Sequence, residues 1–446
     1  MQLPPATTHL IVGLGKTGVS CARFLRRQGI RFAAADTRAE PPGLAAFREE
    51  FPEVAVECGP LQVSTLAAAA TLVMSPGVDL REPAVRAAIA QGAEVTGDID
   101  LFARATTAPI VAITGSNAKS TVTTLVGEMA RAAGRRVAVC GNIGTPALDM
   151  LDGTPIDLVV MELSSFQLET TQALGAKVAT VLNMSPDHVD RYDSMQAYHA
   201  AKHRIFAGCE QVVINREDAL SRPLLAAGVR AHSFGVLPDD SNEFGLIERQ
   251  GEAFLAYRRQ PLLAVSELRI AGQHNVANAL AALALGFAAG LEFAPMLDAL
   301  RHFPGLPHRC QWVATHGGVS WYNDSKGTNV GATVAAIRGL GARHKVVLLA
   351  GGQGKGASFA ELAPALAKQG RMALLFGEDA DQIAAALQGV VPLERVADLA
   401  AAVTRARQHA VPGDVVLLSP ACASFDMFRN YEHRGDVFMQ LVRALA

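Results

Sequence analysis

The sequence predicts an α/β protein with parallel sheets, divided into three domains, and three observations support this prediction. The chain has 446 residues, which at roughly 100–200 residues per domain allows two to four domains. Short apolar, often β-branched runs alternate with Ala/Leu-rich stretches along its whole length. Two of these runs lead into a glycine-containing turn and then a helical stretch, at 9–18 and at 109–121, so the same strand–turn–helix unit begins twice.

The expected strands are apolar throughout rather than alternating, which is typical of parallel strands covered by helices on both faces. They lie at 9–15, 31–37, 71–77, 109–115, 136–142, 158–164, 178–185, 211–217, 345–352, 373–379 and 414–421. Residues 233–270 are expected to form a β meander inserted into the middle domain. Two segments, 97–109 and 302–312, are expected to be domain boundaries, which places the domains at 1–98, 99–304 and 305–446.

Composition excludes several classes of protein. The 40 Lys+Arg against 42 Asp+Glu give a net charge of -2, which argues against a broad nucleic-acid-binding surface. Six cysteines without any C-x-x-C pair give no zinc-site spacing and suggest a reducing compartment. The N-terminal run is too short for a signal peptide, and no apolar stretch of about 18 residues is present, so we expect a cytoplasmic protein without a membrane span.

The first glycine turn, GLGKTG at 13–18, has the spacing of a dinucleotide-binding motif. Gly13, Gly15 and Gly18 allow a tight turn and a close approach of backbone N–H groups to a diphosphate. Asp36 follows at the end of the next expected strand, where an acid can bind a ribose hydroxyl. The motif alone leaves open NAD(P), another nucleotide diphosphate, or a turn that serves only packing.

The second turn has the strand–loop–helix layout of a phosphate loop. Lys119 would neutralise β/γ-phosphates, and the hydroxyl of Ser120 would bind Mg²⁺. The strict pattern G-x-x-x-x-G-K-[ST] is broken by Ile113 and Ala118, which stand at its two glycine positions. A non-glycine residue in the left-handed region costs ~1–2 kcal/mol, so Ala118 is either in an allowed region or slightly strained.

A phosphate loop needs an acid on a neighbouring strand to bind Mg²⁺. Glu162 lies within the expected strand 158–164, where an unpaired carboxylate would be costly to bury. This placement favours a metal ligand. The alternatives are a solvated Glu at a strand end and, for the loop itself, a Ser/Asn helix-capping turn.

Ten motifs occur in one order along the chain: TGSNAKST (114–121), GNIG (141–144), ELSSFQLE (162–169), NMSPDHVDRY (183–192), AKHRIF (201–206), GQHNVANALAA (272–282), PGLPHR (304–309), NDSKGTN (323–329), GGQGKG (351–356) and SPACASFDMF (419–428). Together they resemble the Mur ligase family of peptidoglycan precursor synthesis, and the resemblance covers essentially the whole chain. The third, ninth and tenth look most like the D-glutamate-adding branch of the family.

The resemblance implies an N-terminal Rossmann-like domain for a UDP-sugar, a central P-loop ATPase domain, and a C-terminal Rossmann-like α/β domain for the amino acid. The implied reaction is ATP-dependent ligation of D-glutamate to UDP-N-acetylmuramoyl-L-alanine through an acyl phosphate, by a chain expected to be a monomer. The first turn would then bind the UDP-sugar through Gly13, Gly15, Lys16, Thr17, Asp36, Thr37, Arg38, Gly77 and Asn142.

The resemblance also implies an ATP site and two Mg²⁺ sites. ATP would contact Gly115, Ser116, Asn117, Ala118, Lys119, Ser120, Thr121, Asn275, Asn278, Arg309 and Asp324. The first Mg²⁺ would be held by Ser120 and Glu162, and the second by His188 and a carboxylated Lys202, with Lys119, His188 and Lys202 as catalytic residues. Taken alone, Lys202 has the pattern of a surface helix lysine, but addition of CO₂ would turn it into the anion that a metal requires.

The amino-acid pocket is implied to comprise Thr328, Lys355, Ser424, Phe425 and Tyr431. Two carboxylates on glutamate suit a lysine together with hydroxyl groups. The chain departs from the family pattern at Ala118, at Gln353 in place of Asp, and at Phe425 in place of Leu. These departures affect the geometry of the loop and details of amino-acid binding.

Other functions remain possible from the sequence. A Mur-type ligase adding L-glutamate or another acidic amino acid would carry the same motifs. A folylpolyglutamate synthase would begin at the ATPase domain and leave the first turn unexplained. An NAD-dependent oxidoreductase would leave the phosphate loop unexplained, and a non-catalytic nucleotide-binding regulator would bind ATP without carboxylate-dependent phosphate release.

Overall fold

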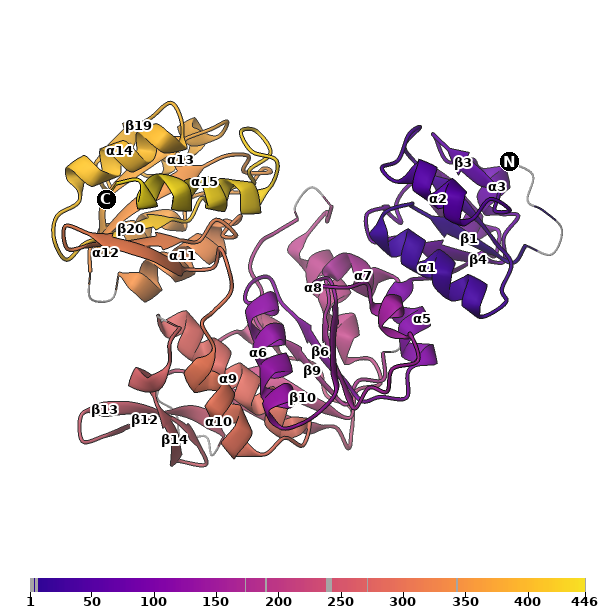
Figure 1. The fold of residues 1–446 in the computed structure, drawn as a ribbon, viewed down its shortest axis with the longest axis horizontal. Coiled ribbons are helices and arrows are strands. Elements are labelled where there is room, and N and C mark those ends of the chain that lie inside the picture. The colour runs from indigo at the N-terminus through magenta and orange to yellow at the C-terminus, as the bar shows by residue number, and fades with distance from the viewer. Residues whose placement is uncertain are drawn as a thin grey trace.

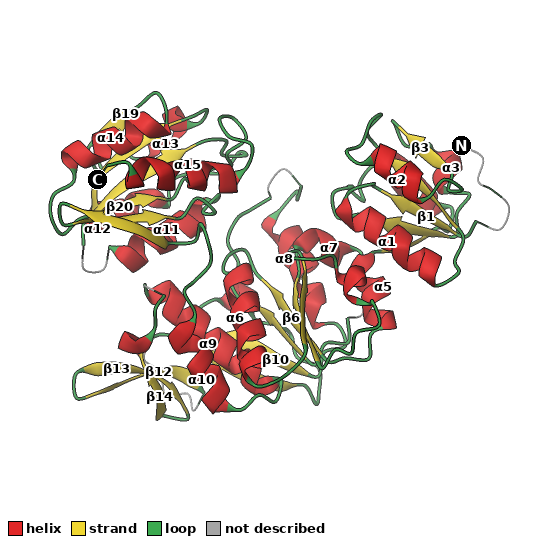
Figure 2. Ribbon diagram, in the orientation of Figure 1, coloured by secondary structure: helices red, strands yellow, loops and turns green. Residues whose placement is uncertain are grey.

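The computed structural model describes residues 4, 7–172, 174–188, 191–237, 243–270, 272–341 and 344–445. Three sheets follow one another along the chain, each covered by helices (Figures 1 and 2). In Figure 1 the first body (indigo) and the third (orange to yellow) flank the middle one. The predicted three-domain α/β class is confirmed.

The first sheet has five parallel strands in the order β3-β2-β1-β4-β5. They are β1 (His9–Val12), β2 (Phe32–Asp36), β3 (Val56–Cys58), β4 (Thr71–Met74) and β5 (Glu94–Thr96). Helices α1 (Lys16–Arg27) and α2 (Leu44–Glu50) cover one face, and α3 (Val63–Leu66) and α4 (Pro83–Ala90) cover the other. The strand order reverses between β1 and β4, and open α/β sheets bind ligands beyond the carboxyl ends of such strands.

The second sheet has nine strands in the order β14-β13-β12-β11-β10-β9-β6-β8-β7. The parallel strands are β6 (Ile110–Thr114), β7 (Val137–Gly141), β8 (Leu158–Glu162), β9 (Val178–Val181), β10 (Gln211–Asn215) and β11 (Arg230–Phe234). The predicted insertion is an antiparallel meander formed by β12 (Phe244–Arg249), β13 (Glu252–Tyr257) and β14 (Gln260–Ala264), which projects from the edge of the middle domain in Figure 2. Residues 238–242 of that prediction lie outside the described residues.

Helices cover both faces of the parallel part of this sheet. One face carries α6 (Lys119–Ala132), α9 (Gln273–Ala288) and α10 (Phe293–His302). The other carries α5 (Asp98–Ala105), α7 (Ser165–Glu169) and α8 (Met195–His203). Short 3₁₀ turns are η1 (Ala147–Met150), η2 (Arg204–Phe206), η3 (Ala219–Ser221) and η4 (Val265–Glu267).

The third sheet has six strands in the order β15-β16-β20-β17-β18-β19. They are β15 (Gln311–His316), β16 (Val319–Asn323), β17 (Val346–Gly351), β18 (Gly370–Phe376), β19 (Leu393–Arg395) and β20 (Val415–Leu418). Helices α11 (Val330–Leu340), α12 (Leu362–Gln369) and α13 (Ala380–Ala386) lie on one face, and α14 (Leu399–His409) and α15 (Tyr431–Arg443) on the other. All neighbours are parallel except β15 and β16, which form an antiparallel hairpin.

The continuous apolar runs follow from cores on both faces of each sheet. In β17, Val346, Leu348 and Ala350 belong to one core, whereas Val347 and Leu349 belong to the core on the opposite face. Successive strand residues point to opposite faces, so a strand buried on both sides is apolar at most of its positions. This is why apolar runs located the central strands in the sequence.

Of the strands that the sequence analysis missed, β15 and β16 form a hairpin of six- and five-residue strands, and three others are short and lie at an edge. Strands β3, β5 and β19 have three residues each and contain a charged residue. Each lies at the end of its sheet. Such a strand buries little surface and is fixed by pairing with its neighbour. In the described part of the chain, no helix is long and apolar enough to cross a membrane.

Candidate active site

The phosphate loop lies between β6 and α6 and is held by a second loop that follows β9. The backbone N–H of Asn117 donates to Oδ1 of Asn183 at 2.8 Å, and Oγ of Ser116 donates to the carbonyl of Ser185 at 2.9 Å. Ala118 caps α6 with φ 67° and ψ −8°. It therefore occupies the left-handed region that glycine adopts more easily, and the slight strain expected for this residue is present.

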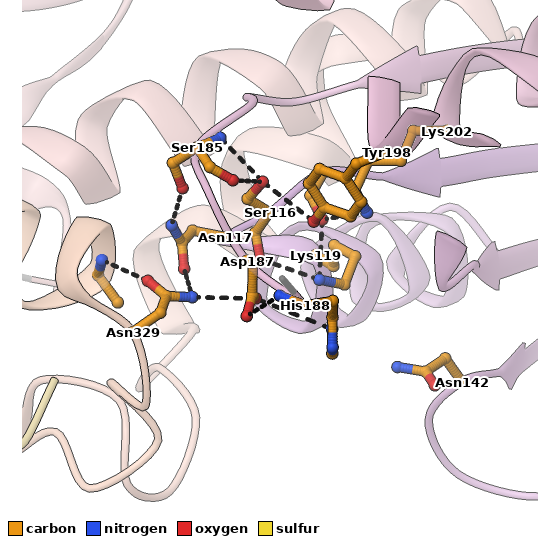
Figure 3. Close-up of polar contacts among 12 residues, drawn as sticks. Ser116, Asn117, Lys119, Asn142, Ser185, Asp187, His188, Tyr198, Lys202 and Asn329 are labelled. Atoms are coloured by element: carbon orange, nitrogen blue, oxygen red, sulfur yellow. Dashed lines mark hydrogen bonds and ion pairs between the residues drawn. The ribbon is translucent and has the colours of Figure 1, made fainter. Parts of the chain in front are cut away.

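Two lysines converge on this loop from different helices (Figure 3). Nζ of Lys119 donates to the carbonyls of Gly115 at 2.8 Å and Ser116 at 3.0 Å. Nζ of Lys202, on α8, donates to the same Gly115 carbonyl at 2.9 Å and to Oγ1 of Thr114 at 3.3 Å. Lys202 is only 2% exposed, so the surface position that its local sequence favours is wrong.

Both ammonium groups are destabilised electrostatically. Burial lowers the pKa of Lys202 well below its ordinary value, and the neighbouring charge of Lys119 lowers it further. Burial also lowers the pKa of Lys119, against an opposing effect of Glu162. A buried amine with a lowered pKa is more often unprotonated, and only the unprotonated amine is a nucleophile.

Glu162 ends β8 and is 1% exposed. Its Oε1 accepts a hydrogen bond from Nδ2 of Asn142 at 2.8 Å, while its Oε2 is buried without a hydrogen-bond partner among the described residues. An unsatisfied buried carboxylate oxygen is costly and is the kind of ligand that Mg²⁺ prefers. Oγ of Ser120 lies 3.3 Å from Nζ of Lys326. The charge of Glu162 also acts on Lys326, so Glu162 and Ser120 lie in the same neighbourhood. Their oxygens fit a divalent-cation site beside the phosphate loop.

His188 follows the loop after β9 and has φ 54°. Its ring lies edge-on to Phe166 with centroids 4.7 Å apart, and its Nε2 lies 3.9 Å from Oδ2 of Asp187. Burial lowers the pKa of His188, with Asp187 acting in the opposite direction. A neutral imidazole can donate its lone pair to a metal. Within the described ranges, no three His, Cys, Asp or Glu residues are grouped as metal ligands.

The third domain reaches into this site. Nδ2 of Asn329, at the start of α11, lies 3.2 Å from Oδ1 of Asn117 and 3.3 Å from Oδ2 of Asp187 (Figure 3). The Lys326–Ser120 contact comes from the same segment. Burial and the charge of Arg309 lower the pKa of Lys326 to about 8. The second and third domains therefore share one polar interface at the phosphate loop.

A cavity of about 280 Å³ lies between the phosphate loop, α9 and the β15–β16 hairpin. Its lining contains seven of the predicted ATP residues: Asn117, Ala118, Thr121, Asn275, Asn278, Arg309 and Asp324. Nδ2 of Asn278 donates to Oδ1 of Asn275 at 3.1 Å. Burial raises the pKa of Asp324 to about 6. The structure thus brings together residues that are some 200 positions apart in the sequence.

A second cavity, of about 640 Å³, lies at the reversal of strand order in the first sheet. All nine predicted UDP-sugar residues line it: Gly13, Gly15, Lys16, Thr17, Asp36, Thr37, Arg38, Gly77 and Asn142. Both carboxylate oxygens of Asp36 already accept hydrogen bonds, from the N–H of Leu14 at 2.7 Å and from Arg38 at 2.8 Å. Burial would raise the pKa of Asp36, but these hydrogen bonds outweigh it and the pKa is lowered.

A third, smaller cavity of about 140 Å³ lies between the His188 loop and the third domain. Two of the five predicted amino-acid residues, Thr328 and Lys355, line it together with Asp187 and His188. The other three are not part of its lining. Ser424 is buried, Phe425 is 67% exposed, and the ring of Tyr431 lies 5.2 Å from Nζ of Lys326.

Several lining residues were not predicted. In the 280 Å³ cavity they include His274, Trp312 and Tyr322, and in the 640 Å³ cavity Ser75 and Gln167. His274 lies in the motif GQHN and Gln167 in ELSSFQLE, so the motifs could have indicated both residues. Trp312 and Tyr322 belong to the unpredicted hairpin, so no sequence signal connected them to this site.

Comparison with known proteins gives matches over the whole chain. Residues 7–97 match a family model described as Mur ligase MurD-like, N-terminal domain; residues 113–286 match the Mur ligase middle domain; and residues 308–422 match the Mur ligase, glutamate ligase domain. Proteins named UDP-N-acetylmuramoylalanine--D-glutamate ligase are similar, at 59% identity over 440 residues in Pseudomonas fluorescens Pf-5 and in Pseudomonas aeruginosa PAO1. Each alignment covers 98% of both chains.

Solved structures agree on the fold at lower identity. UDP-N-acetylmuramate-alanine ligase MurC from Thermotoga maritima matches with a TM-score of 0.60 at 19% identity, covering 98% of this chain and 100% of that one. MurF from Acinetobacter baumannii matches with a TM-score of 0.60 at 15% identity, covering 98% and 92%.

Proposed function

The chain belongs to the Mur ligase family, and from this premise we propose that it joins D-glutamate to UDP-N-acetylmuramoyl-L-alanine at the expense of ATP. The reaction would take place in the cytoplasm, during synthesis of the peptidoglycan precursor. The similarity to D-glutamate ligases over 98% of both chains is the observation that carries this proposal. An NAD-dependent oxidoreductase is not favoured, because it would leave the phosphate loop and its cavity without a role.

We propose the domain boundaries 1–98, 99–304 and 305–446, with one substrate for each domain. The 640 Å³ cavity would take the UDP-sugar, the 280 Å³ cavity the nucleotide, and the 140 Å³ cavity the glutamate. His188 and Asp187 line the glutamate cavity and follow β9 next to the phosphate loop. The acyl group and the incoming amine would therefore meet beside His188.

The first step forms a bond between a carboxylate oxygen of the UDP-sugar and the γ-phosphorus of ATP, while the bond to the β-phosphate oxygen breaks and ADP leaves. In the second step, the amine of glutamate attacks the acyl carbon, loses a proton and displaces phosphate. Both steps bring anions together, so fixed cations lower the barrier. Lys119 and Lys326 would supply such cations, because the first contacts backbone carbonyls of the phosphate loop and the second contacts the hydroxyl of Ser120.

Mg²⁺ would neutralise charge on the triphosphate when bound. The unpartnered Oε2 of Glu162 and the hydroxyl of Ser120 fit a first ion. For a second ion, we propose that His188 is joined by Lys202, which becomes an anionic ligand by carboxylation. Its Nζ would add to CO₂ with loss of a proton, forming a carbamate, and the lowered pKa of the buried amine favours this addition.

For the amino acid, we propose that Lys355 and Thr328 bind a carboxylate of glutamate, because both line the cavity next to His188. Ser424, Phe425 and Tyr431 are proposed to join this site only through a rearrangement of residues 424–431. Lys355 has φ 53°, a conformation that a non-glycine residue keeps only when its surroundings impose it.

A single assay tests the function. The protein is supplied with UDP-N-acetylmuramoyl-L-alanine, ATP and Mg²⁺ together with one amino acid at a time, and phosphate release and product mass are measured. We expect release with D-glutamate and a product heavier by one glutamyl residue. No release with D-glutamate, or equal release with L-glutamate, would refute the assignment.

A further inference from the structure

One wall of the nucleotide cavity carries an exposed tryptophan. Trp312 is the second residue of β15 and is 57% exposed although it lines the cavity. Its cross-strand partner in the hairpin is Tyr322, which lines the same cavity. Tryptophan is largely buried in most proteins. An exposed indole beside a cavity therefore leaves a large apolar surface available to a ligand.

The polar edge of this indole is already satisfied. Nε1 of Trp312 donates to Oγ1 of Thr315 at 3.3 Å, and Thr315 lies 3.3 Å from the hydroxyl of Ser320 on the paired strand. The strand pairing shifts register between Trp312 and Ala314, so the ring is set by an irregularity of the hairpin. Because the N–H is bound to its own hairpin, the part of the ring left for a ligand is its π-face.

The remaining lining indicates which ligand this face would meet. Asn117 and Ala118 of the phosphate loop lie in the same cavity, so phosphates are expected at that end. The amides of Asn275 and Asn278 supply donors and acceptors for the edge of a base. The lining also has an apolar part, formed by Ile270, Pro304, Leu306, Ala335 and Ala336, beside charged residues such as Arg269, Arg309 and Asp324. A flat heteroaromatic ring fits between amides on its edge and an indole on its face.

We propose that Trp312 is a base-stacking residue of the nucleotide site, where its indole face covers the purine ring of ATP. This proposal rests on the proposed ATP-dependent function and adds a determinant of base specificity. A purine offers a larger π-surface than a pyrimidine, so stacking favours ATP over UTP and CTP. The hairpin belongs to the third domain, so the base would also connect that domain to the phosphate loop.

The first test uses the intrinsic fluorescence of the full chain. The sequence contains two tryptophans, and the other one, Trp321, is 1% exposed in the core of the third domain. We expect ATP and ADP to quench the emission of the wild-type protein, and Trp312→Phe to abolish most of this quenching. Quenching that persists in Trp312→Phe would come from Trp321 and would overturn the proposal.

The second test separates the base from the phosphates. Dissociation constants for ATP, ADP and inorganic tripolyphosphate are measured by calorimetry for the wild type, Trp312→Ala and Trp312→Phe. Stacking on one exposed ring predicts a loss of about tenfold in affinity for ATP and ADP in Trp312→Ala, a smaller loss in Trp312→Phe, and no change for tripolyphosphate. The preference for ATP over UTP should fall by a similar factor. Val411→Ala, at another exposed apolar side chain of the same domain, is the matched control.

The outcomes distinguish this proposal from the function on which it rests. Wild-type protein that does not bind ATP would refute the ATP-dependent function. ATP binding that is unchanged in Trp312→Ala would refute stacking alone. An equal loss for ATP and tripolyphosphate would show that Trp312 only supports the fold of the hairpin, which would also refute stacking.

Discussion

Replacing Lys202 by Met tests whether a buried amine is kept for chemistry rather than for stability. The change removes two hydrogen bonds, to the carbonyl of Gly115 and to Oγ1 of Thr114, worth together about 1–3 kcal/mol. Neither acceptor is left without a partner, because Gly115 still accepts from Lys119 and Thr114 still donates to Leu163. The change also removes a buried charge, whose desolvation costs several kcal/mol. We therefore expect Lys202→Met to be at least as stable as the wild type near neutral pH.

The pH dependence of stability tests separately whether the buried Lys202 ammonium destabilises the fold. Burial lowers the pKa of Lys202 in the folded protein below that of the unfolded chain. Between these two values the unfolded state binds more protons, so wild-type stability rises with pH across that window. The Met variant lacks this contribution. Denaturant unfolding at several alkaline pH values should therefore show a smaller rise for Lys202→Met than for the wild type.

Activity should respond in the opposite direction. Lys202→Ala is expected to lose at least about 100-fold in the rate of phosphate release, because the proposed metal ligand is removed. Formate or acetate should restore part of the rate in Lys202→Ala, where the cavity has room for a small carboxylate, but not in Lys202→Met, where the side chain fills it. Lys177→Ala is the control, since Lys177 is a surface lysine paired with Glu210.

Three results would refute this reasoning about Lys202. They are full activity of Lys202→Ala, equal rescue of the Ala and Met variants, and destabilisation of Lys202→Met by more than about 3 kcal/mol, the upper value for the two lost hydrogen bonds. A ¹³C carbamate signal after incubation with labelled bicarbonate should be present in the wild type and absent from both variants.

Three other substitutions test the strain, the metal site and the junction of the first two domains. Ala118→Gly relieves the strain of a left-handed conformation, which costs ~1–2 kcal/mol. The greater freedom of glycine in the unfolded chain offsets roughly 0.5–1 kcal/mol of this gain. The melting temperature should therefore rise by a few degrees at most, and a fall would contradict the strain. Glu162→Gln keeps a hydrogen-bond acceptor for Asn142 but loses the anionic oxygen. The Mg²⁺ concentration for half-maximal phosphate release should therefore rise at least about tenfold. An unchanged Mg²⁺ requirement would rule out Glu162 as a ligand. Burial raises the pKa of Asp98 to about 6, so the folded state binds a proton that the unfolded state has lost, and wild-type stability falls as pH rises from about 4 to 6. Asp98→Asn should remove this fall and be more stable than the wild type at pH 7.5 by up to about 3 kcal/mol. The urea midpoints of both proteins at pH 5 and 7.5 measure the difference.

Local pattern was sufficient where the chemistry is local. The turns at 13–18 and 115–121 each lie within a few residues of one strand and one helix, so spacing alone predicted them. The order of the motifs extended the prediction to distant residues such as Asn275 and Arg309, which line one cavity with the phosphate loop. The central strands were predicted because burial on both faces makes them apolar at most of their positions.

Burial of single polar groups was not predictable from local sequence. Lys202 lies in a helix whose neighbours resemble a surface face, yet α8 packs it against the loop of another strand. Likewise, Asn329 contacts Asn117 only because two domains meet. The separation of Asn117 and Asn329 in the sequence does not predict their contact, because the contact depends on how the sheets and helices pack.

The sequence by itself determined the class of fold, the three-domain order and the two glycine turns, because these depend on periodicity and on backbone conformations that few residues allow. Only the tertiary structure decided which side chains share a cavity and with what charge. It buried Lys202, left Oε2 of Glu162 without a partner among the described residues and set Trp312 on the wall of the 280 Å³ cavity. The reason is physical: desolvation and stacking depend on every atom around a group, and most of those atoms come from distant parts of the chain.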